Sequence, residues 1–206
     1  MNSTPKALTL AATGASGAVL TREILRRLEA DPRVEHVDFI ISEGGLRVCA
    51  EEIGIPGRSK LLDYMLGYAS KKTTESANMD IGGCVASGSY PSDAMIVLPC
   101  SMGTLARIAN GTAQALIERA ADVTLKERRP LILCIRETPY NRIHLRNMQL
   151  ASDAGAVIYP VTPVFYDKPV DTQAMAQQFV DRVLGHIGLP QKDAYVWTGR
   201  KKSTKT

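Results

Sequence analysis

The chain has 206 residues and a formal net charge of +4, with 45% hydrophobic and 22% charged residues. These proportions predict a globular protein with one core, and the weak, scattered charge argues against a nucleic-acid partner. No apolar run is long enough to span a bilayer, and the N-terminal segment lacks the apolar core of a secretory signal. We therefore expect a cytoplasmic protein with no membrane partner.

One domain is expected over residues 1–198, followed by a basic tail, residues 199–206, that we expect to be disordered. The four cysteines are Cys49, Cys84, Cys100 and Cys134; they form no C-x-x-C pair and have no histidine at metal-ligand spacing. The sequence therefore predicts reduced, structural thiols and no metal site.

Apolar runs of strand length alternate with amphipathic stretches along the chain. Strands are predicted over Ala7–Ala12, Val37–Ile41, Ala94–Leu98, Leu131–Ile135 and Ala156–Tyr159. Helices are predicted over Leu20–Leu28, Leu46–Glu52, Lys60–Tyr68, Gln114–Arg128, His144–Ala154 and Ala174–Ile187. Strands that alternate with helices need crossover connections, so we expect a three-layer α/β fold with a parallel sheet and helices on both faces. Ligands of such sheets bind at the carboxyl ends of the strands.

The turn Thr13-Gly14-Ala15-Ser16-Gly17 follows the first strand and leads into a helix. Glycines allow a tight turn and a close approach to a ligand, and the N–H groups at a helix start favour an anion. Ser16 can add a hydroxyl donor. A plain strand-to-helix turn would have the same pattern, and neither the dinucleotide nor the Walker A glycine motif is present.

A second such loop, Ser101-Met102-Gly103-Thr104, follows the run Ala94–Leu98, and Ser101 or Thr104 can cap the next helix. Two loops of this kind on neighbouring strands could hold one phosphate and its attached ring system. Glu43 ends the second strand, where an NAD-binding protein keeps its ribose-binding acid, so an NAD site remains a rival interpretation.

Several longer motifs resemble one known family, the UbiX flavin prenyltransferases. The motifs are Thr13-Gly14-Ala15-Ser16-Gly17-Ala18, Ala86-Ser87-Gly88-Ser89, Pro99-Cys100-Ser101-Met102-Gly103-Thr104, Ile117-Glu118-Arg119-Ala120-Ala121-Asp122, Leu125-Lys126-Glu127-Arg128-Arg129-Pro130, Arg136-Glu137-Thr138-Pro139 and His144-Leu145-Arg146-Asn147-Met148. The resemblance runs from about Ala7 to Trp197 and is most specific between Asn110 and Met148. One departure is Asp80-Ile81-Gly82-Gly83, where many members carry an aromatic residue that shapes the prenyl pocket.

The resemblance implies a flavodoxin-like or Rossmann-like flavoprotein domain and an enzyme that joins a dimethylallyl group to reduced FMN. It implies dimethylallyl phosphate as the donor, no metal, a homododecamer with sites between subunits, and a UbiD-type decarboxylase as recipient of the prenylated FMN. Residues matching FMN-binding positions are Gly14, Ala15, Ser16, Ser42, Ser101, Met102, Gly103, Thr104 and Arg136. Residues matching dimethylallyl phosphate or other phosphate-side positions are Tyr166, Arg182, Ser87, Arg119, Lys126 and Glu137, and Glu52 and Trp197 match positions that line the reaction chamber.

The chemistry accounts for this choice of residue types. Breaking an allylic C–O bond places negative charge on the leaving phosphate, which a metal-free site must stabilise with fixed cations and hydrogen-bond donors. Lys126, Arg136 and Arg182 are the candidate cations, and Tyr166 is a candidate hydroxyl donor. Each also has a structural interpretation: Lys126 lies at a helix end that favours cations, Arg182 suits a solvated helix face, and Tyr166 suits packing.

The proton-transfer candidates also remain open. Glu137 follows Arg136, so it could relay a proton to the leaving phosphate or simply form an ion pair with an arginine. Ser16 and Glu52 could orient the flavin edge or move protons. Trp197 could stabilise an allylic cation with its ring face or anchor the tail on a neighbouring subunit.

Two other functions compete with prenyl transfer. One is an FMN-dependent cysteine decarboxylase, and the other is a non-catalytic FMN-binding subunit of a decarboxylase. We find neither the early-helix histidine nor the Pro-x-Met-Asn stretch of the cysteine decarboxylases. Holding FMN alone would not require the four phosphate-binding candidates Lys126, Arg136, Tyr166 and Arg182.

Overall fold

The computed structural model describes residues 4–165 and 168–196. In this part of the chain, parallel strands form one sheet in the order β3-β2-β1-β4-β5-β6. Their bounds are Ala7–Ala12 (β1), His36–Ile41 (β2), Thr73–Ala77 (β3), Ala94–Cys100 (β4), Leu131–Ile135 (β5) and Val157–Ile158 (β6). The α/β class with a parallel sheet is confirmed. This strand order is that of doubly wound nucleotide-binding folds, in which the chain adds strands outward on one side of β1 and then on the other side, beginning with β4.

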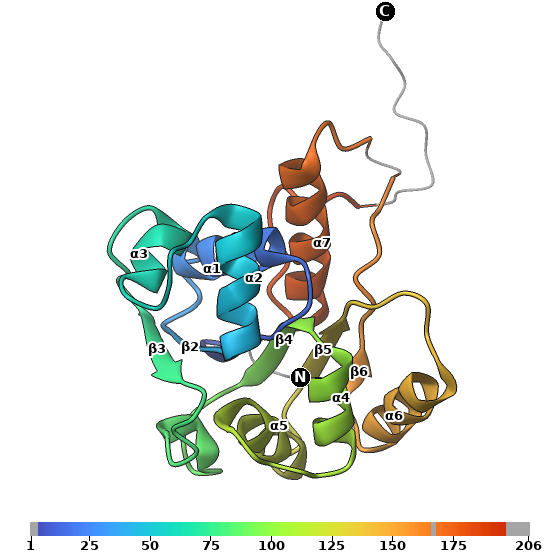
Figure 1. The fold of residues 1–206 in the computed structure, drawn as a ribbon. Coiled ribbons are helices and arrows are strands. Elements are labelled where there is room, and N and C mark those ends of the chain that lie inside the picture. Colours follow the sequence, from blue (N-terminus) through green and yellow to red (C-terminus); the bar gives the residue numbers. More distant parts are fainter. Residues whose placement is uncertain (1–3, 166–167, 197–206) are drawn as a thin grey trace, which may run out of the picture.

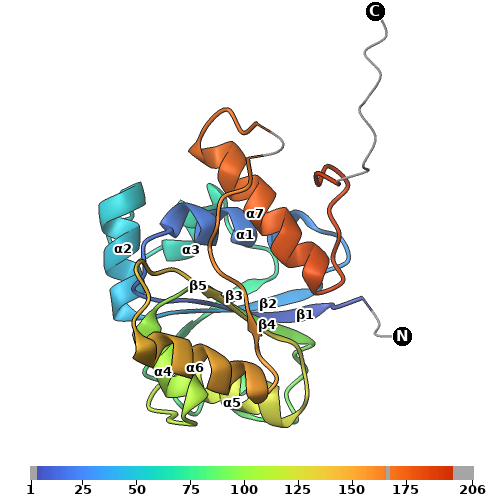
Figure 2. The same cartoon turned by 90° about the vertical axis from the view of Figure 1, so that its right-hand side faces the viewer.

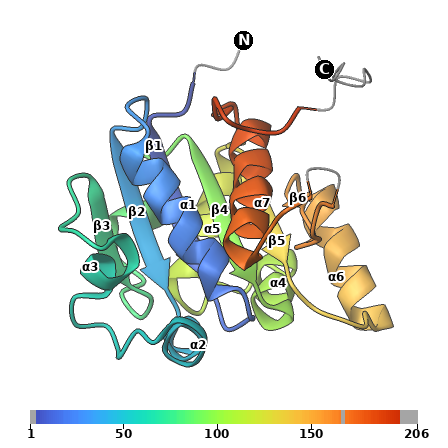
Figure 3. The ribbon, with the colours of Figure 1, turned by 90° about the horizontal axis from the view of Figure 1, so that it is seen from above.

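Helices cover both faces of the sheet (Figures 1 and 2). Their bounds are Ala18–Ala30 (α1), Glu43–Ile53 (α2), Leu61–Leu66 (α3), Met102–Ala109 (α4), Leu116–Lys126 (α5), Arg142–Asp153 (α6) and Thr172–His186 (α7), with a short 3₁₀ helix η1 at Cys84–Ala86. Helices α1, α2, α3 and α7 lie on one face, and α4, α5 and α6 lie on the other (Figure 2). Figure 3 shows α1 and α7 side by side over the strands.

Alternate residues of the central strands point into two apolar cores, one on each face. Leu8 and Leu10 of β1 belong to the core between the sheet and helices α1 and α7. Ala11 belongs to the core between the sheet and helices α4 and α5. In β2, Phe39 and Ile41 face the first core and Ile40 faces the second. Burial on both faces explains why these strands are mainly apolar in sequence, with Thr9 in β1 and Asp38 in β2 as polar residues within them.

The structure adds a strand that apolar runs did not reveal. Strand β3, with the sequence Thr-Thr-Glu-Ser-Ala, pairs only with β2 and forms one edge of the sheet. An edge strand is held by backbone hydrogen bonds and buries few side chains, so its sequence can stay polar. The structure also gives bounds to the helix after Ser101, α4, for which the sequence predicted no range. Most of the remaining helices and strands differ from the prediction at their ends; α1, for example, begins at Ala18, directly after Gly17 with its φ of 132°. No described helix is long and apolar enough to cross a bilayer.

Candidate active site at the carboxyl edge of the sheet

The loops that follow β1 and β4 are joined by hydrogen bonds through one buried hydroxyl. Thr13 Oγ1 donates to the carbonyl oxygen of Pro99 at 2.9 Å and accepts from the N–H of Ser101 at 2.8 Å. Strands β1 and β4 are direct neighbours in the sheet, at the point where its strand order reverses. The structure therefore confirms that the two glycine-containing loops lie on adjacent strand tips.

The start of α1 is occupied by a carboxylate of the protein itself. Glu52, near the end of α2, accepts the N–H groups of Gly17 and Ala18 on Oε2 at 2.9 and 2.8 Å. Burial acts to raise the pKa of Glu52, but the Ser16 hydroxyl, these two N–H groups and the charge of Arg136 together lower it. The N–H groups at the start of α1 thus bind an anion, as expected, but in this structure that anion is the Glu52 carboxylate.

The start of α2 approaches the first loop so closely that a side chain at either contact position would be crowded. A Cβ at Gly14 would lie 3.2 Å from the Cα of Gly44, and a Cβ at Gly44 would lie 3.1 Å from the Cα of Gly14. Ser42 caps α2 by accepting the N–H of Gly45 at 3.0 Å. The first N–H groups of a helix have no intrahelical partner, so those at the start of α2 that Ser42 does not cap can serve as anion donors near the first loop.

The start of α4 presents a second set of donors. Ser101 caps this helix by accepting the N–H of Thr104 at 3.3 Å, and its hydroxyl donates to Thr104 Oγ1 at 3.2 Å. Thr104 is buried and Met102 is nearly so, whereas Gly103 is exposed. The backbone of the first turn of α4 is thus accessible beside the first loop.

Arg136, directly after β5, adds a cation to the same edge. Its Nε donates to the carbonyl oxygen of Ser16 at 3.3 Å, and its backbone N–H donates to Cys100 at 3.2 Å. Its side chain therefore reaches the turn that contains Ser16. Glu137 accepts the N–H of Thr138 at 2.9 Å, and no ion pair with Arg136 forms in the described residues, so its carboxylate is not neutralised there.

Lys126 and Ser87 belong to a second group, which lies near the amino ends of the strands, opposite their carboxyl ends. Lys126 is the last residue of α5, which leads into β5 from its amino end, and it forms an ion pair with Glu127. Both side chains lie over the backbone of Gly88, because a Cβ built there would overlap them. The Ser87 and Ser89 hydroxyls lie 3.0 Å apart in the same turn.

The two groups lie at opposite ends of one strand. The five residues of β5 lie between Lys126 and Arg136, and at about 3.3 Å per residue they span roughly 17 Å. The Lys126 amino group pairs with Glu127 beside Gly88, whereas the Arg136 side chain reaches Ser16. The chain alone does not bring all the predicted phosphate-binding residues together.

Arg119 and Arg182 lie in neither group. Arg119, on α5, pairs with Asp122 at 2.7 Å. Arg182, on α7, lines a hollow of about 320 Å³ beside the edge strand β6, together with Tyr159 and Phe179. Burial raises the pKa of Tyr159, and the charge of Arg182 opposes that effect. Tyr166 and Trp197, the other two predicted site residues, lie outside the described residues.

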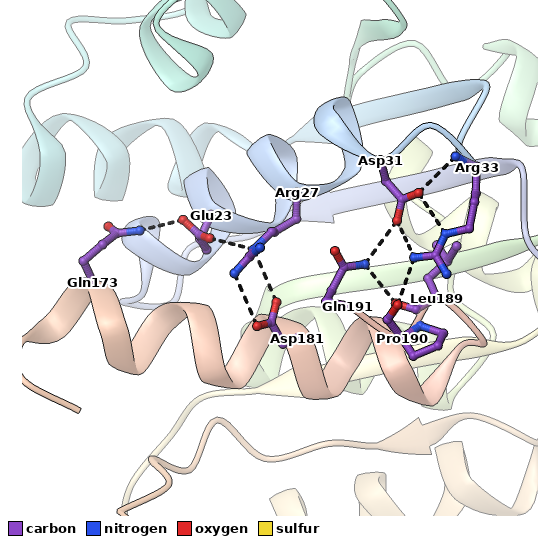
Figure 4. Close-up of polar contacts among 9 residues, drawn as sticks. All are labelled: Glu23, Arg27, Asp31, Arg33, Gln173, Asp181, Leu189, Pro190 and Gln191. Atoms are coloured by element: carbon purple, nitrogen blue, oxygen red, sulfur yellow. Dashed lines mark hydrogen bonds and ion pairs between the residues drawn. The ribbon is translucent and has the colours of Figure 1, made fainter. Parts of the chain in front are cut away.

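A polar network joins α1 to α7 next to Arg182, which is not part of it (Figure 4). Arg27 of α1 lies 3.2 Å from Glu23 Oε1 and 3.3 Å from Asp181 Oδ1, and Gln173 donates to Glu23 at 2.6 Å. Asp181 is buried against α1, and its neighbour Arg182 is exposed. The network therefore turns α7 so that Arg182 faces the hollow and not the core.

Two features of the site were missed by sequence reasoning. The pair Gly44-Gly45 follows the second strand and brings α2 against the first loop; two adjacent glycines at a helix start could have signalled that contact. The Thr13 hydroxyl, which joins the β1 and β4 loops, has no such signal in the sequence. Among the described residues, no three His, Cys, Asp or Glu side chains gather as a metal-binding group.

Comparison with known proteins identifies the family. The model of the Flavoprotein family matches residues 1–188. Flavin prenyltransferase UbiX of Pseudomonas aeruginosa is 41% identical, over 91% of each chain. The crystal structure of AnUbiX (PadA1) in complex with FMN and dimethylallyl pyrophosphate superposes with a TM-score of 0.84 at 37% identity, covering 95% of this chain and 99% of the other. A dodecameric FMN-dependent UbiX-like decarboxylase from Escherichia coli O157:H7 gives a TM-score of 0.83 at 35% identity, covering 94% and 100%. On this identity and coverage, the chain belongs to the UbiX family of flavin prenyltransferases.

Proposed function

We propose that the protein transfers the dimethylallyl group of dimethylallyl phosphate to reduced FMN and releases prenylated FMN. The observation that carries this proposal is the junction of the β1 and β4 loops through Thr13, with Arg136 reaching the same turn. This junction creates a site for a flavin nucleotide at the carboxyl edge of the sheet. Membership of the UbiX family supplies the reaction type.

The residues at this edge fit FMN. The backbones of Gly14 and Gly44 approach each other closely, and neither residue carries a side chain that would block a ligand from the backbone. The free N–H groups at the starts of α2 and α4, with the Arg136 guanidinium, suit a phosphate or the polar rim of a flavin ring. The residues that would hold FMN are Gly14, Ala15, Ser16, Ser42, Ser101, Met102, Gly103, Thr104 and Arg136.

Reduced FMN supplies two ring atoms, the nitrogen N5 and the carbon C6, and the five-carbon unit of the donor becomes bonded to both. The allylic C–O bond breaks and its electron pair leaves with the phosphate as N5 bonds to the terminal carbon of the donor and loses its proton. The alkene of the attached unit then takes up one proton, the tertiary carbon made electron-deficient by this step bonds to C6, and the C6 proton passes to phosphate or solvent. The protein must hold the donor in line with the flavin and stabilise charge on the leaving phosphate. At an effective dielectric of about 20, unit charges about 4 Å apart interact by roughly 4 kcal/mol, so a few fixed cations lower this barrier substantially.

The cations for the leaving phosphate come from more than one subunit in this proposal. Lys126 and Ser87 lie near the amino ends of the strands, whereas Arg136 follows the carboxyl end of β5, so one chain does not place them side by side. A homododecamer whose sites lie between subunits would unite them, and the UbiX-like protein from E. coli is described as dodecameric. Arg119, Arg182 and Tyr166 are the further phosphate-side candidates, with Trp197 lining the chamber. These cations take the role that a metal ion has in other prenyl transfers.

Proton movements fall to two carboxylates. Glu52 is ionised and held at the start of α1, one residue from Ser16, so it is placed to accept or return a proton at the flavin edge. Glu137 has no cationic partner among the described residues and stands beside Arg136, where it can exchange a proton with the leaving phosphate. We assign Glu52 to the flavin side and Glu137 to the phosphate side.

The product would serve a UbiD-type decarboxylase in the cytoplasm. The donor bound in the AnUbiX crystal is dimethylallyl pyrophosphate. The monophosphate and the diphosphate carry the same allylic ester, so both belong in the assay.

Anaerobic incubation of the protein with reduced FMN and either donor, followed by mass spectrometry of the flavin, tests the proposal. A flavin heavier by one C5 unit supports prenyl transfer. Unchanged flavin with carbon dioxide released from a cysteinyl peptide would instead indicate a cysteine decarboxylase. Unchanged flavin without any turnover would indicate an FMN-binding subunit.

A further inference from the structure

An ion pair between a partly exposed arginine, Arg107, and a buried glutamate, Glu118, lies behind the second flavin loop. Neither residue is among those assigned to the site above. Arg107, on α4, donates from Nε to Glu118 Oε1 at 2.6 Å. Glu118, on α5, is 4% exposed, and its second carboxylate oxygen has no hydrogen-bond partner among the described residues. A buried carboxylate needs such a cation, so Glu118 strongly fixes the position of the Arg107 side chain.

The Arg107 guanidinium reaches back along α4 to its first turn. Nη2 donates to Thr104 Oγ1 at 3.5 Å, and Nη1 lies 3.7 Å from the position of a Cβ at Gly103. Residues three and four apart share one face of a helix, which is why Arg107 meets both. The ion pair thus touches the loop that we assign to FMN.

This contact determines what the Thr104 hydroxyl can do. A hydroxyl has two acceptor positions and one proton to donate. Thr104 Oγ1 accepts from Ser101 Oγ at 3.2 Å and from Arg107, so both acceptor positions are used. Its proton is left to donate, and no other described residue accepts it in the contacts of this loop.

We propose that Arg107, held by Glu118, is a positioning residue that fixes the Thr104 hydroxyl as a donor to FMN bound at the start of α4. The inference rests on the proposed function, because it requires FMN at this loop. Arg107 itself need not touch the flavin; it acts through Thr104. Losing one charge-assisted hydrogen-bond network of this kind weakens binding by about tenfold.

The test replaces the ion pair as a unit. Arg107→Ala alone would leave Glu118 as an unpaired buried charge and could unfold the protein, whereas replacing both partners with uncharged side chains usually preserves the fold. The main variant is therefore Arg107→Met with Glu118→Gln, made in the wild type and in Thr104→Val. Arg47→Ala, which removes an exposed arginine paired with Glu51, is the control.

Binding is measured by quenching of oxidised FMN fluorescence, with the melting temperature of the FMN-free protein recorded for each variant. We expect the double replacement to raise the Kd for FMN about tenfold in the wild-type background and less than twofold in Thr104→Val. An equal rise in both backgrounds, or a lower melting temperature with an unchanged Kd, would show that the pair is only structural. If the wild-type protein itself binds no FMN, the proposed function fails and this inference fails with it.

Discussion

Glu52 caps α1 from outside the helix: its Oε2 accepts the N–H of Ala18 at 2.8 Å. The two residues are 34 positions apart, so α2 and not the preceding loop completes the start of α1. This places an ionised carboxylate one residue from Ser16. In our proposal the Glu52 carboxylate both caps α1 and moves a proton. Replacing it with an amide of the same shape separates these two roles.

Glu52→Gln should keep the fold and FMN binding but lose prenyl transfer. The glutamine side-chain oxygen still accepts the N–H groups of Gly17 and Ala18, whereas the amide cannot take up a proton. General acid–base catalysis typically contributes about 10²–10⁴-fold, so we expect transfer to slow by at least about 10²-fold. The rate of C5 addition to reduced FMN, followed by mass spectrometry in anaerobic samples, measures this effect.

Glu51→Gln is the matched control, because Glu51 is the exposed neighbour that pairs with Arg47 on the helix surface. It should transfer at the wild-type rate. Equal rates in Glu52→Gln and wild type would show that Glu52 serves only as a helix cap.

The contact between α2 and the sheet gives a second prediction. A Cβ at Gly45 would lie 2.9 Å from Ile41 Cγ1 and 3.0 Å from the carbonyl oxygen of Ala12. Gly45→Ala should therefore push α2 away from the end of β1 and destabilise the fold by about 1–3 kcal/mol. FMN affinity should fall as well, because Ser42 and Glu52 move with α2.

Gly185→Ala controls for the removal of a glycine. Gly185 lies within α7, and a Cβ there would meet no atom within 4 Å. The alanine should raise stability by about 0.5–1 kcal/mol through helix propensity and leave FMN affinity unchanged. Urea unfolding and FMN titration of both variants provide the comparison, and equal stability of Gly45→Ala and wild type would contradict the packing argument.

Acid should unfold the protein in part through Asp31. This buried carboxylate accepts a bidentate contact from Arg33 at 2.9 and 2.6 Å and a hydrogen bond from Gln191 at 3.1 Å (Figure 4). The Arg33 side chain, against the opposing effect of burial, holds the pKa of Asp31 well below its ordinary value. A lowered pKa in the folded state stabilises the fold above the unfolded-state value of about 3.9, and this contribution is lost as the pH falls below that value.

Asp31→Asn should therefore cost about 3 kcal/mol near pH 7, with a smaller cost below about pH 4. Urea unfolding across this pH range measures the difference. Asp153→Asn, an exposed carboxylate at the end of α6, should change little at any pH. A cost for Asp31→Asn that stays constant down to about pH 3 would contradict the ionic origin of the effect.

The sequence predicts the buried centre of this fold well. Strands β1, β2, β4 and β5 bury both faces, so they stand out as apolar runs such as Leu131–Ile135. Strand β3 has one strand neighbour and a polar sequence, so no periodicity reveals it. The carboxyl-edge loops could be predicted because they follow such runs directly.

The contacts between loops could not be predicted in the same way. Nothing near Glu52 in the sequence indicates that its carboxylate closes the start of α1, because that contact depends on how α2 packs against the first loop. The position of Lys126 could have been deduced. A residue that precedes the run Leu131–Ile135 must lie at the amino edge of a parallel sheet, and Arg136, which follows that run, must lie at the other edge.

The separation of Lys126 and Arg136 leads to a prediction about subunit sharing. Lys126→Ala should abolish prenyl transfer and retain FMN, because Lys126 is assigned to the phosphate of the donor. Arg136→Ala should lose both prenyl transfer and FMN binding, because Arg136 contacts the turn to which we assign FMN. Arg128→Ala, an exposed arginine two residues after Lys126, is the control and should transfer at the wild-type rate.

Mixed oligomers of the two inactive variants should regain activity if sites lie between subunits. When each site takes Lys126 from one subunit and Arg136 from another, random assembly of equal amounts gives both wild-type side chains in about a quarter of the sites. Co-expression with two affinity tags isolates such mixtures, and the C5 transfer rate per FMN measures the recovery. Mixed oligomers that stay inactive would place both residues in the site of a single chain or remove Lys126 from the reaction, and either result would refute the shared site.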